Sequence, residues 1–126
     1  MLKLDRDAAS SVFFDGTANG VLLLRQCMRC GHWNSPETML CSACHTDELE
    51  WKESSGRGVV ESWAVVRPRH EKGLPMTVGI VELDEGPWMR GQLRIRELQA
   101  LRRGMRIITS FDAADGGESL PVFEVL

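Results

Sequence analysis

Four cysteines in two identical pairs constrain the fold of this chain more than any other feature. Each pair has the spacing C-x2-C, and ten residues separate the two pairs. A C-x2-C turn directs two sulfurs at one ion, and the intervening segment brings the second turn opposite the first, which completes a tetrahedron. The sequence therefore predicts a metal site whose ligands are Cys27, Cys30, Cys41 and Cys44.

A site of four thiolates leaves no open position for water or substrate, so we expect a structural role. Zinc accepts this geometry without electronic preference, and one structural zinc ion is the predicted occupant. Iron in the same ligand set stays open, because spacing alone does not distinguish the two metals. A ribbon of about 30 residues buries too little apolar surface to fold alone, so metal binding also supplies its folding energy.

Redox and disulfide roles fit these cysteines less well. A redox C-x2-C needs only one pair, at the N-terminus of a helix. Disulfides require an exported chain, and the opening MLKLDRDAAS has charges but no apolar segment of signal-peptide type. The apolar run at 21–24 is far shorter than a membrane span. We therefore expect a cytoplasmic protein with no membrane segment.

Composition divides the 126 residues into a helix within 1–20, a zinc ribbon at 21–53 and a strand-rich domain at 54–126. The helix is predicted over 7–20, with Asp7 as N-cap and with Ala8, Val12 and Phe13 on one face. The ribbon has a strand before its first cysteine pair, in VLLLRQ, and another after its second pair, in LEWKE.

The last region has strand patterns at 59–66, 77–83 and 86–95, a short helix at 96–104, and strands at 105–111 and 120–126. Three strands, a helix and two strands are the order of the five-stranded oligonucleotide/oligosaccharide-binding (OB) barrel, with its helix between strands three and four. The predicted fold class is therefore mainly β. We expect Trp63 to pack inside the barrel.

A set of short motifs in a fixed order resembles one known family. The motifs are FFDG, G-VLLLRQC, CxxCG, CxxC, LEW, a G-x-G entry to a strand, an RP loop, V-LDEG, a late GM and a terminal PVF. In this order they resemble the acyl-CoA-associated zinc-ribbon/OB-fold proteins, formerly a domain of unknown function, from Phe13 to Phe123. The chain departs from the family pattern at Phe14, where Trp is common, at Asn34–Ser35, where more proline is usual, and at His45, where Gly is usual.

The resemblance implies an N-terminal helix, a rubredoxin-like zinc ribbon and an OB barrel. It also implies a non-catalytic subunit beside a thiolase-like or aldolase-like enzyme of acyl-CoA metabolism, or less often a hydratase. Such a subunit helps assembly and shapes the channel for the CoA ester, and two copies on a central dimer are expected. No catalytic residue is predicted, because the thiols are used by the ribbon and His70 has no serine or cysteine beside it.

The loop after the first barrel strand is the predicted contact for the CoA ester. Arg67, Arg69, His70 and Lys72 bring three formal cations against Glu71 in a chain of net charge −3. OB folds bind ligands over strands two and three and through their first loop, and guanidinium groups match phosphates. The alternative is an exposed loop that is solvated or forms ion pairs with a partner.

Aromatic residues are the predicted contacts with the partner protein. Phe13 and Phe14 are adjacent, so one is expected to pack inward while the other faces a partner. Trp88 follows a Gly-Pro turn and is expected at an interface, where aromatics are enriched. The second interpretation is a module that binds single-stranded nucleic acid, but the chain is acidic overall and strand two carries only acidic charge.

Overall fold

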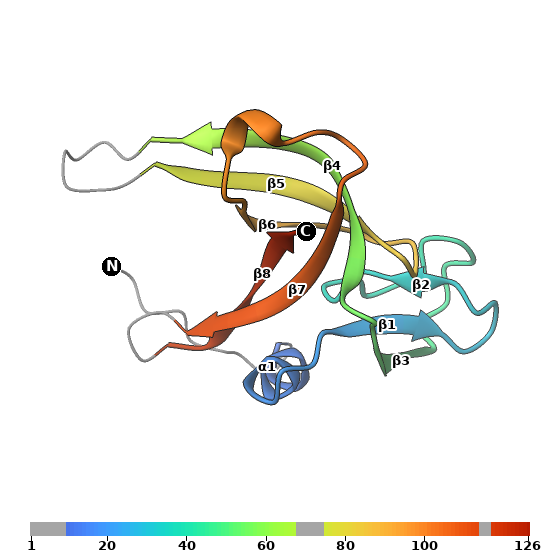
Figure 1. The fold of residues 1–126 in the computed structure, drawn as a ribbon. Coiled ribbons are helices and arrows are strands. Elements are labelled where there is room, and N and C mark those ends of the chain that lie inside the picture. The colour runs from blue at the N-terminus through green and yellow to red at the C-terminus, as the bar shows by residue number, and fades with distance from the viewer. Residues whose placement is uncertain (1–9, 68–74, 114–116) are drawn as a thin grey trace.

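The computed structural model describes residues 10–67, 75–113 and 117–126. Figure 1 shows a short helix, a small sheet and a barrel. The helix is α1 (Ser11–Ala18), and the small sheet contains β1 (Leu23–Cys27), β2 (Trp33–Asn34) and β3 (Leu49–Glu53). The barrel contains β4 (Arg57–Val66), β5 (Met76–Leu83), β6 (Trp88–Arg94), the 3-10 turn η1 (Leu98–Ala100), β7 (Arg106–Ala113) and β8 (Ser119–Val125).

The barrel is closed in the order β4-β5-β6-β8-β7. Its neighbours are antiparallel except β6 and β8, which run parallel. This is the strand order of an OB barrel, so the predicted fold class is confirmed. The strands approach closely at Gly58, where a Cβ would lie 2.2 Å from the carbonyl oxygen of Glu82. A side chain at this position would therefore separate β4 from β5.

The helical segment between strands three and four of the barrel is shorter than predicted. Only Leu98–Ala100 form a 3-10 turn, whereas the sequence pattern predicted a helix over 96–104. The next residue, Leu101, has an extended backbone (φ −64°, ψ 129°) and a side chain only 1% exposed. The chain leaves the helical conformation here because Leu101 enters the barrel core.

Helix α1 begins at Ser11 rather than after Asp7, which lies outside the described residues. Its buried residues are Phe14, Gly16 and Thr17, and α1 contacts β8 and β1. Val12 is 43% exposed, whereas Phe13 is half-buried. No helix among the described residues is long and apolar enough to cross a bilayer.

One hydrophobic cluster joins the small sheet to the barrel. Leu22 and Leu24 enter it from the segment that contains β1, and the other members come from the barrel strands and the turn after η1. Its fully buried members are Leu22, Leu24, Val60, Val81, Leu83, Leu93, Leu101, Ile107 and Phe123. The ribbon is therefore packed on the barrel through a shared core.

Glu85 reinforces the junction between the small sheet and the barrel. Ser54 Oγ donates a hydrogen bond to Glu85 Oε1 (2.8 Å), and the backbone N–H of Ser55 donates to Oε2 (2.7 Å). The same Ser54 oxygen accepts the N–H of Gly56 at 2.9 Å. The segment between β3 and β4 is thus held by the turn between β5 and β6.

The outer half of β4 extends beyond the closed part of the barrel. Its register with β5 shifts between Val60 and Ser62, and every residue from Ser62 to Val66 is exposed. Trp63 is 38% exposed, so the prediction that it packs inside the barrel was wrong. Trp63 lies beyond the part of β4 that pairs with β7, where the barrel no longer has an interior to receive it.

Candidate functional site

The four cysteines converge on one point at the end of the small sheet. Their sulfurs all lie within 4.8 Å of one another. The Sγ atoms of Cys27 and Cys44 are 3.5 Å apart, and those of Cys30 and Cys41 are 3.6 Å apart. A tetrahedral ion with metal–sulfur bonds of about 2.3 Å places its ligands about 3.8 Å apart, so the donor set fits a structural metal ion.

Each cysteine pair sits in a tight turn that exposes backbone N–H groups to sulfur. The N–H groups of Arg29 and Cys30 point at Cys27 Sγ, both at 3.4 Å, and the N–H of Ala43 points at Cys41 Sγ, also at 3.4 Å. These donors favour thiolates, which are the form that binds metal.

The two turns close in the same way, through residues with positive φ. Gly31 (φ 80°) donates its N–H to the Cys27 carbonyl at 3.0 Å, and His45 (φ 65°) donates to the Cys41 carbonyl at 2.8 Å. His45 thus adopts a backbone conformation that favours glycine, the residue usual in the family pattern at this position. His32 and His45 are both exposed.

The thiol pKa values show why the four sulfurs need a cation. Burial raises the pKa of Cys41, but the backbone N–H groups of Cys44 and Ala43 outweigh it and lower that pKa to about 6. The N–H of His32 favours the thiolate of Cys30, yet burial and the neighbouring thiols raise its pKa to about 12. Four thiolates so close together repel one another, and a divalent ion removes this conflict.

The side chain of Asn34 links the two cysteine turns by hydrogen bonds. It is 3% exposed, and its Oδ1 accepts hydrogen bonds from both the N–H and the Oγ of Ser42, each at 3.0 Å. Its Nδ2 donates to the His32 carbonyl at 3.2 Å. Sequence reasoning missed this role, although Asn34 was one of the positions that depart from the family pattern.

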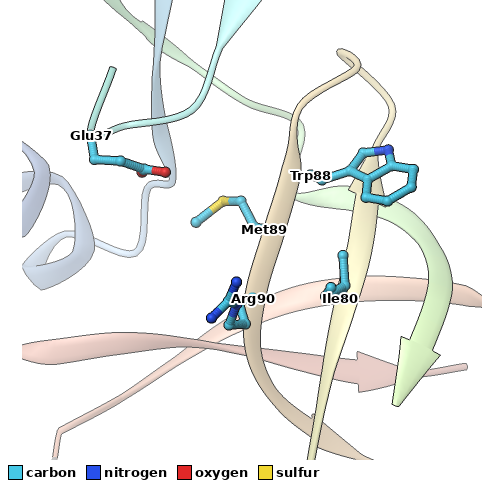
Figure 2. Close-up of a pocket in the computed structure, with 5 residues that line it drawn as sticks. All are labelled: Glu37, Ile80, Trp88, Met89 and Arg90. Carbon is cyan, nitrogen blue, oxygen red and sulfur yellow. The ribbon is translucent and has the colours of Figure 1, made fainter. Parts of the chain in front are cut away.

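A second feature is a hollow of about 380 Å³ over strands two and three of the barrel. It is lined by Ile80 from β5, by Trp88, Met89 and Arg90 from β6, and by Glu37 from the ribbon. Figure 2 shows Glu37 on the ribbon segment facing Met89 and Arg90 across the hollow. OB folds bind their ligands on this face, so it is a candidate binding surface that sequence reasoning identified only at Trp88.

The predicted partner-contact residues lie in different environments. Trp88 is 56% exposed, and its Nε1 donates to Glu82 Oε2 at 2.9 Å, which fixes the ring at the surface. Phe14 is 9% exposed, and Phe13 is half-buried and packs against the core cluster. Both line an apolar groove of about 340 Å³ with Met39 and Trp51, so contact of either ring with a partner stays a prediction.

The structure describes only the beginning of the predicted CoA-contact loop. Arg67 follows β4 directly and is exposed. Arg69, His70 and Lys72 lie outside the described residues. The structure therefore places only Arg67, directly after β4, and the contact itself stays a prediction.

Two adjacent family models match this chain. The model described as the rubredoxin-like zinc ribbon domain of ChsH2 matches residues 14–50. The model described as the C-terminal OB-fold domain of ChsH2 matches residues 51–112. The boundary between the two matches falls within β3, and the second match ends in β7, before β8.

The curated relatives align with this chain over only part of their own length. A DUF35 domain-containing scaffold protein of Pyrococcus furiosus is 31% identical over 80 residues, which are 61% of this chain and 59% of that protein. A probable enoyl-CoA hydratase alpha subunit of Thermomonospora curvata is 27% identical over 122 residues, which are 95% of this chain and 38% of that protein. This chain thus spans less than two thirds of the length of either relative.

Among solved structures, a chain of the Ltp2-ChsH2(DUF35) aldolase has the same architecture. The TM-score is 0.81 and the identity 26%, over 99% of this chain and 98% of that chain. The family resemblance read from the sequence motifs is therefore confirmed. Two consecutive family matches and a similarity along the whole chain show that this protein belongs to the DUF35 family, with a ChsH2-type zinc ribbon followed by a ChsH2-type OB-fold domain.

Proposed function

We propose that this chain is a non-catalytic subunit that assembles with an aldolase-like or thiolase-like enzyme acting on acyl-CoA esters. The observation that carries the proposal is the similarity along nearly the whole chain to a protein of the Ltp2-ChsH2(DUF35) aldolase. The name scaffold protein given to the Pyrococcus furiosus relative supports the same role. The partner supplies the reacting groups, and this chain supplies binding surface.

In this proposal the metal site is structural and holds zinc. The sulfurs of Cys27 and Cys41 are buried and the ribbon shares its core with the barrel, so the metal stabilises the surface presented to the partner. Elemental analysis of the purified protein tests the metal. One zinc per chain is expected, whereas a red protein with one iron per chain would contradict the assignment to zinc.

Co-expression with a thiolase-like or aldolase-like protein encoded beside this chain tests the assembly. We expect the two proteins to co-purify and to elute together in size-exclusion chromatography with light scattering, as two copies of this chain on a central dimer. The catalytic subunit alone should be poorly active or insoluble. Full activity of that subunit without this chain would contradict the proposal.

A hydratase complex is the second candidate. It is favoured by the Thermomonospora curvata relative, named a probable enoyl-CoA hydratase alpha subunit, which aligns with 95% of this chain. Retro-aldol cleavage and hydration are distinguished by assaying the purified complex with a β-hydroxyacyl-CoA and with the corresponding enoyl-CoA. Release of a ketone or aldehyde identifies an aldolase, and simple water addition identifies a hydratase.

The loop that begins at Arg67 is proposed to contact the phosphates of the CoA ester, through Arg67, Arg69, His70 and Lys72. Replacing Arg67 and Arg69 with alanine should weaken acyl-CoA binding by the assembled complex. The matched control replaces Arg57, at the opposite end of β4, and Arg96, both of which are exposed. Equal acyl-CoA affinity of the loop variant and the control would contradict this contact.

A further inference from the structure

The outer half of β4 has a free edge. Strand β7 pairs with β4 only at Arg57–Val59, and two backbone hydrogen bonds join Val60 to residues 104 and 105. From Ser62 to Val66 the only paired neighbour of β4 within the described chain is β5. Figure 1 shows these ends of β4 and β5 side by side and apart from β7 and β8. Among residues 10–67, 75–113 and 117–126, no strand pairs with the backbone N–H and C=O groups along this side of β4 from Ser62 to Val66, so the edge can accept another strand.

The side chains along this edge are apolar on both faces of the strand pair. Trp63 and Val65 are 38% and 37% exposed, and Val66 and Met76, which face each other across the pair, are 50% and 45% exposed. No residue from Ser62 to Val66 carries a charge. Native proteins usually blunt an exposed edge with charged residues, proline or a covering element, and this edge has none of them among the described residues.

The small sheet of the same protein shows the usual protection. Strand β3 lies at the edge of that sheet, and Glu50, Lys52 and Glu53 on it are exposed. Lys52 and Glu50 also form an ion pair at 3.2 Å. One edge in this chain is thus charged and the other is apolar, and the difference indicates that the β4 edge is covered in the assembled protein.

We propose that the β4 edge at Ser62–Val66 accepts an extended segment of the catalytic partner as an added strand. This inference rests on the proposed function. Only an extended backbone pairs with a strand edge, so the segment is extended, and it is apolar where it contacts Trp63 and Val65. Arg67 directly follows the edge and is exposed, and its five N–H donors can serve a carboxylate of the segment beside a CoA phosphate, so a segment with a carboxylate at that end complements its charge.

A second copy of this chain matches the edge less well than such a partner. If two copies paired antiparallel about Ala64, each Arg67 would lie opposite Glu61 of the other copy. The carboxylate of Glu61 is already paired with Arg103 at 3.0 Å, and its side chain is only 14% exposed. A copy therefore offers no free carboxylate to Arg67, whereas an acidic partner segment does.

Hydrogen–deuterium exchange of the co-purified complex, compared with the free chain, tests strand addition. Amides within Ser62–Val66 should exchange more slowly in the complex, because added backbone hydrogen bonds protect them. Amides of β3 should exchange equally in both samples. Amide exchange reports on backbone hydrogen bonds and not on side-chain contacts. If the partner contacts only the apolar side chains, the Ser62–Val66 amides exchange equally fast in both samples, and strand addition is overturned.

A variant pair adds an independent measurement. Val65→Lys places a charge on the edge and should weaken the complex about tenfold or more. The control, Leu40→Lys, places the same charge on a side chain 56% exposed on the ribbon and should leave edge protection unchanged. Zinc content and thermal unfolding verify that both variants fold.

The outcomes separate this inference from the proposed function. A complex that forms without protection of Ser62–Val66, and that tolerates Val65→Lys, overturns strand addition and leaves the accessory role intact. Protection of the same amides in a dimer of this chain alone identifies a second copy as the occupant and overturns the proposal. Failure of every thiolase-like, aldolase-like and hydratase partner to bind overturns the proposed function, and strand addition with it.

Discussion

The junction between the ribbon and the barrel depends on one carboxylate, which makes Glu85→Ala an informative perturbation. Glu85 accepts hydrogen bonds from Ser54 Oγ at 2.8 Å and from Ser55 N–H at 2.7 Å. Ser54 is 7% exposed, whereas the bond to Ser55 is exposed to water. We assign about 1.5 kcal/mol to the first bond and about 0.5 kcal/mol to the second, a loss of about 2 kcal/mol.

This loss should be visible in thermal unfolding of the zinc-loaded protein. With about 2.1 cal/mol/K of unfolding entropy per residue, a chain of 126 residues loses about 4 °C in Tm for each kcal/mol. Glu85→Ala should therefore unfold about 8 °C below the wild type. Glu85→Gln keeps one acceptor oxygen but turns an amide N–H toward the N–H of Ser55. Its Tm should therefore lie between those of Glu85→Ala and the wild type.

The control is Glu53→Ala, which removes an exposed glutamate on β3, next to the same junction. It should change Tm by less than about 2 °C, as surface substitutions usually do. Equal Tm values for Glu85→Ala and Glu53→Ala would refute the reasoning, because the junction would then be held by the shared core alone.

Four further predictions concern the metal site and the barrel. Cys41→Ser should remove the metal, measured by elemental analysis, and abolish the ribbon's cooperative unfolding, whereas the neighbouring Ser42→Ala should retain one ion per chain. Zinc must displace the protons of the metal-free thiols, and burial and neighbouring thiols raise the pKa of Cys30 even though the pKa of Cys41 is lowered; zinc affinity should therefore fall with pH, and a chelator should capture more zinc as the pH falls from 8. His45→Val should destabilise the protein by about 1 kcal/mol or more, since a β-branched residue disfavours φ 65°, while His45→Gly should leave Tm unchanged or raise it. Gly58→Ala should lower Tm more than any of the surface variants, because its Cβ would lie 2.2 Å from the Glu82 carbonyl oxygen.

Much of the fold could be predicted because its signals are local. The C-x2-C spacing defines each metal-binding turn within a few residues, and the alternating pattern of LEWKE matches β3. The order of three strands, a helical segment and two strands identified the barrel. The positive φ of His45 was also predictable, since the turn that requires it lies directly after the second cysteine pair.

Sequence patterns did not reveal the environment of side chains that is set by long-range packing. Asp84 and Glu85 lie in LDEG, a sequence typical of a turn, and nothing local indicates their partners: Asp84 pairs with Arg106 at 3.1 Å, and Glu85 accepts a hydrogen bond from Ser54, 31 residues earlier. The apolar pattern of its strand predicted that Trp63 packs in the barrel. Its exposure follows from where β7 stops pairing with β4, which no local pattern encodes.

The sequence by itself determined the metal ligands, the order of the barrel strands and the family. These depend on spacing and periodicity, which the chain carries in consecutive residues. Only the tertiary structure decided that ribbon and barrel share one core, that Asn34 joins the two cysteine turns, and that the outer half of β4 has a free apolar edge. Each of these depends on which distant segments meet, because burial and pairing are properties of the folded chain and not of any one stretch of it.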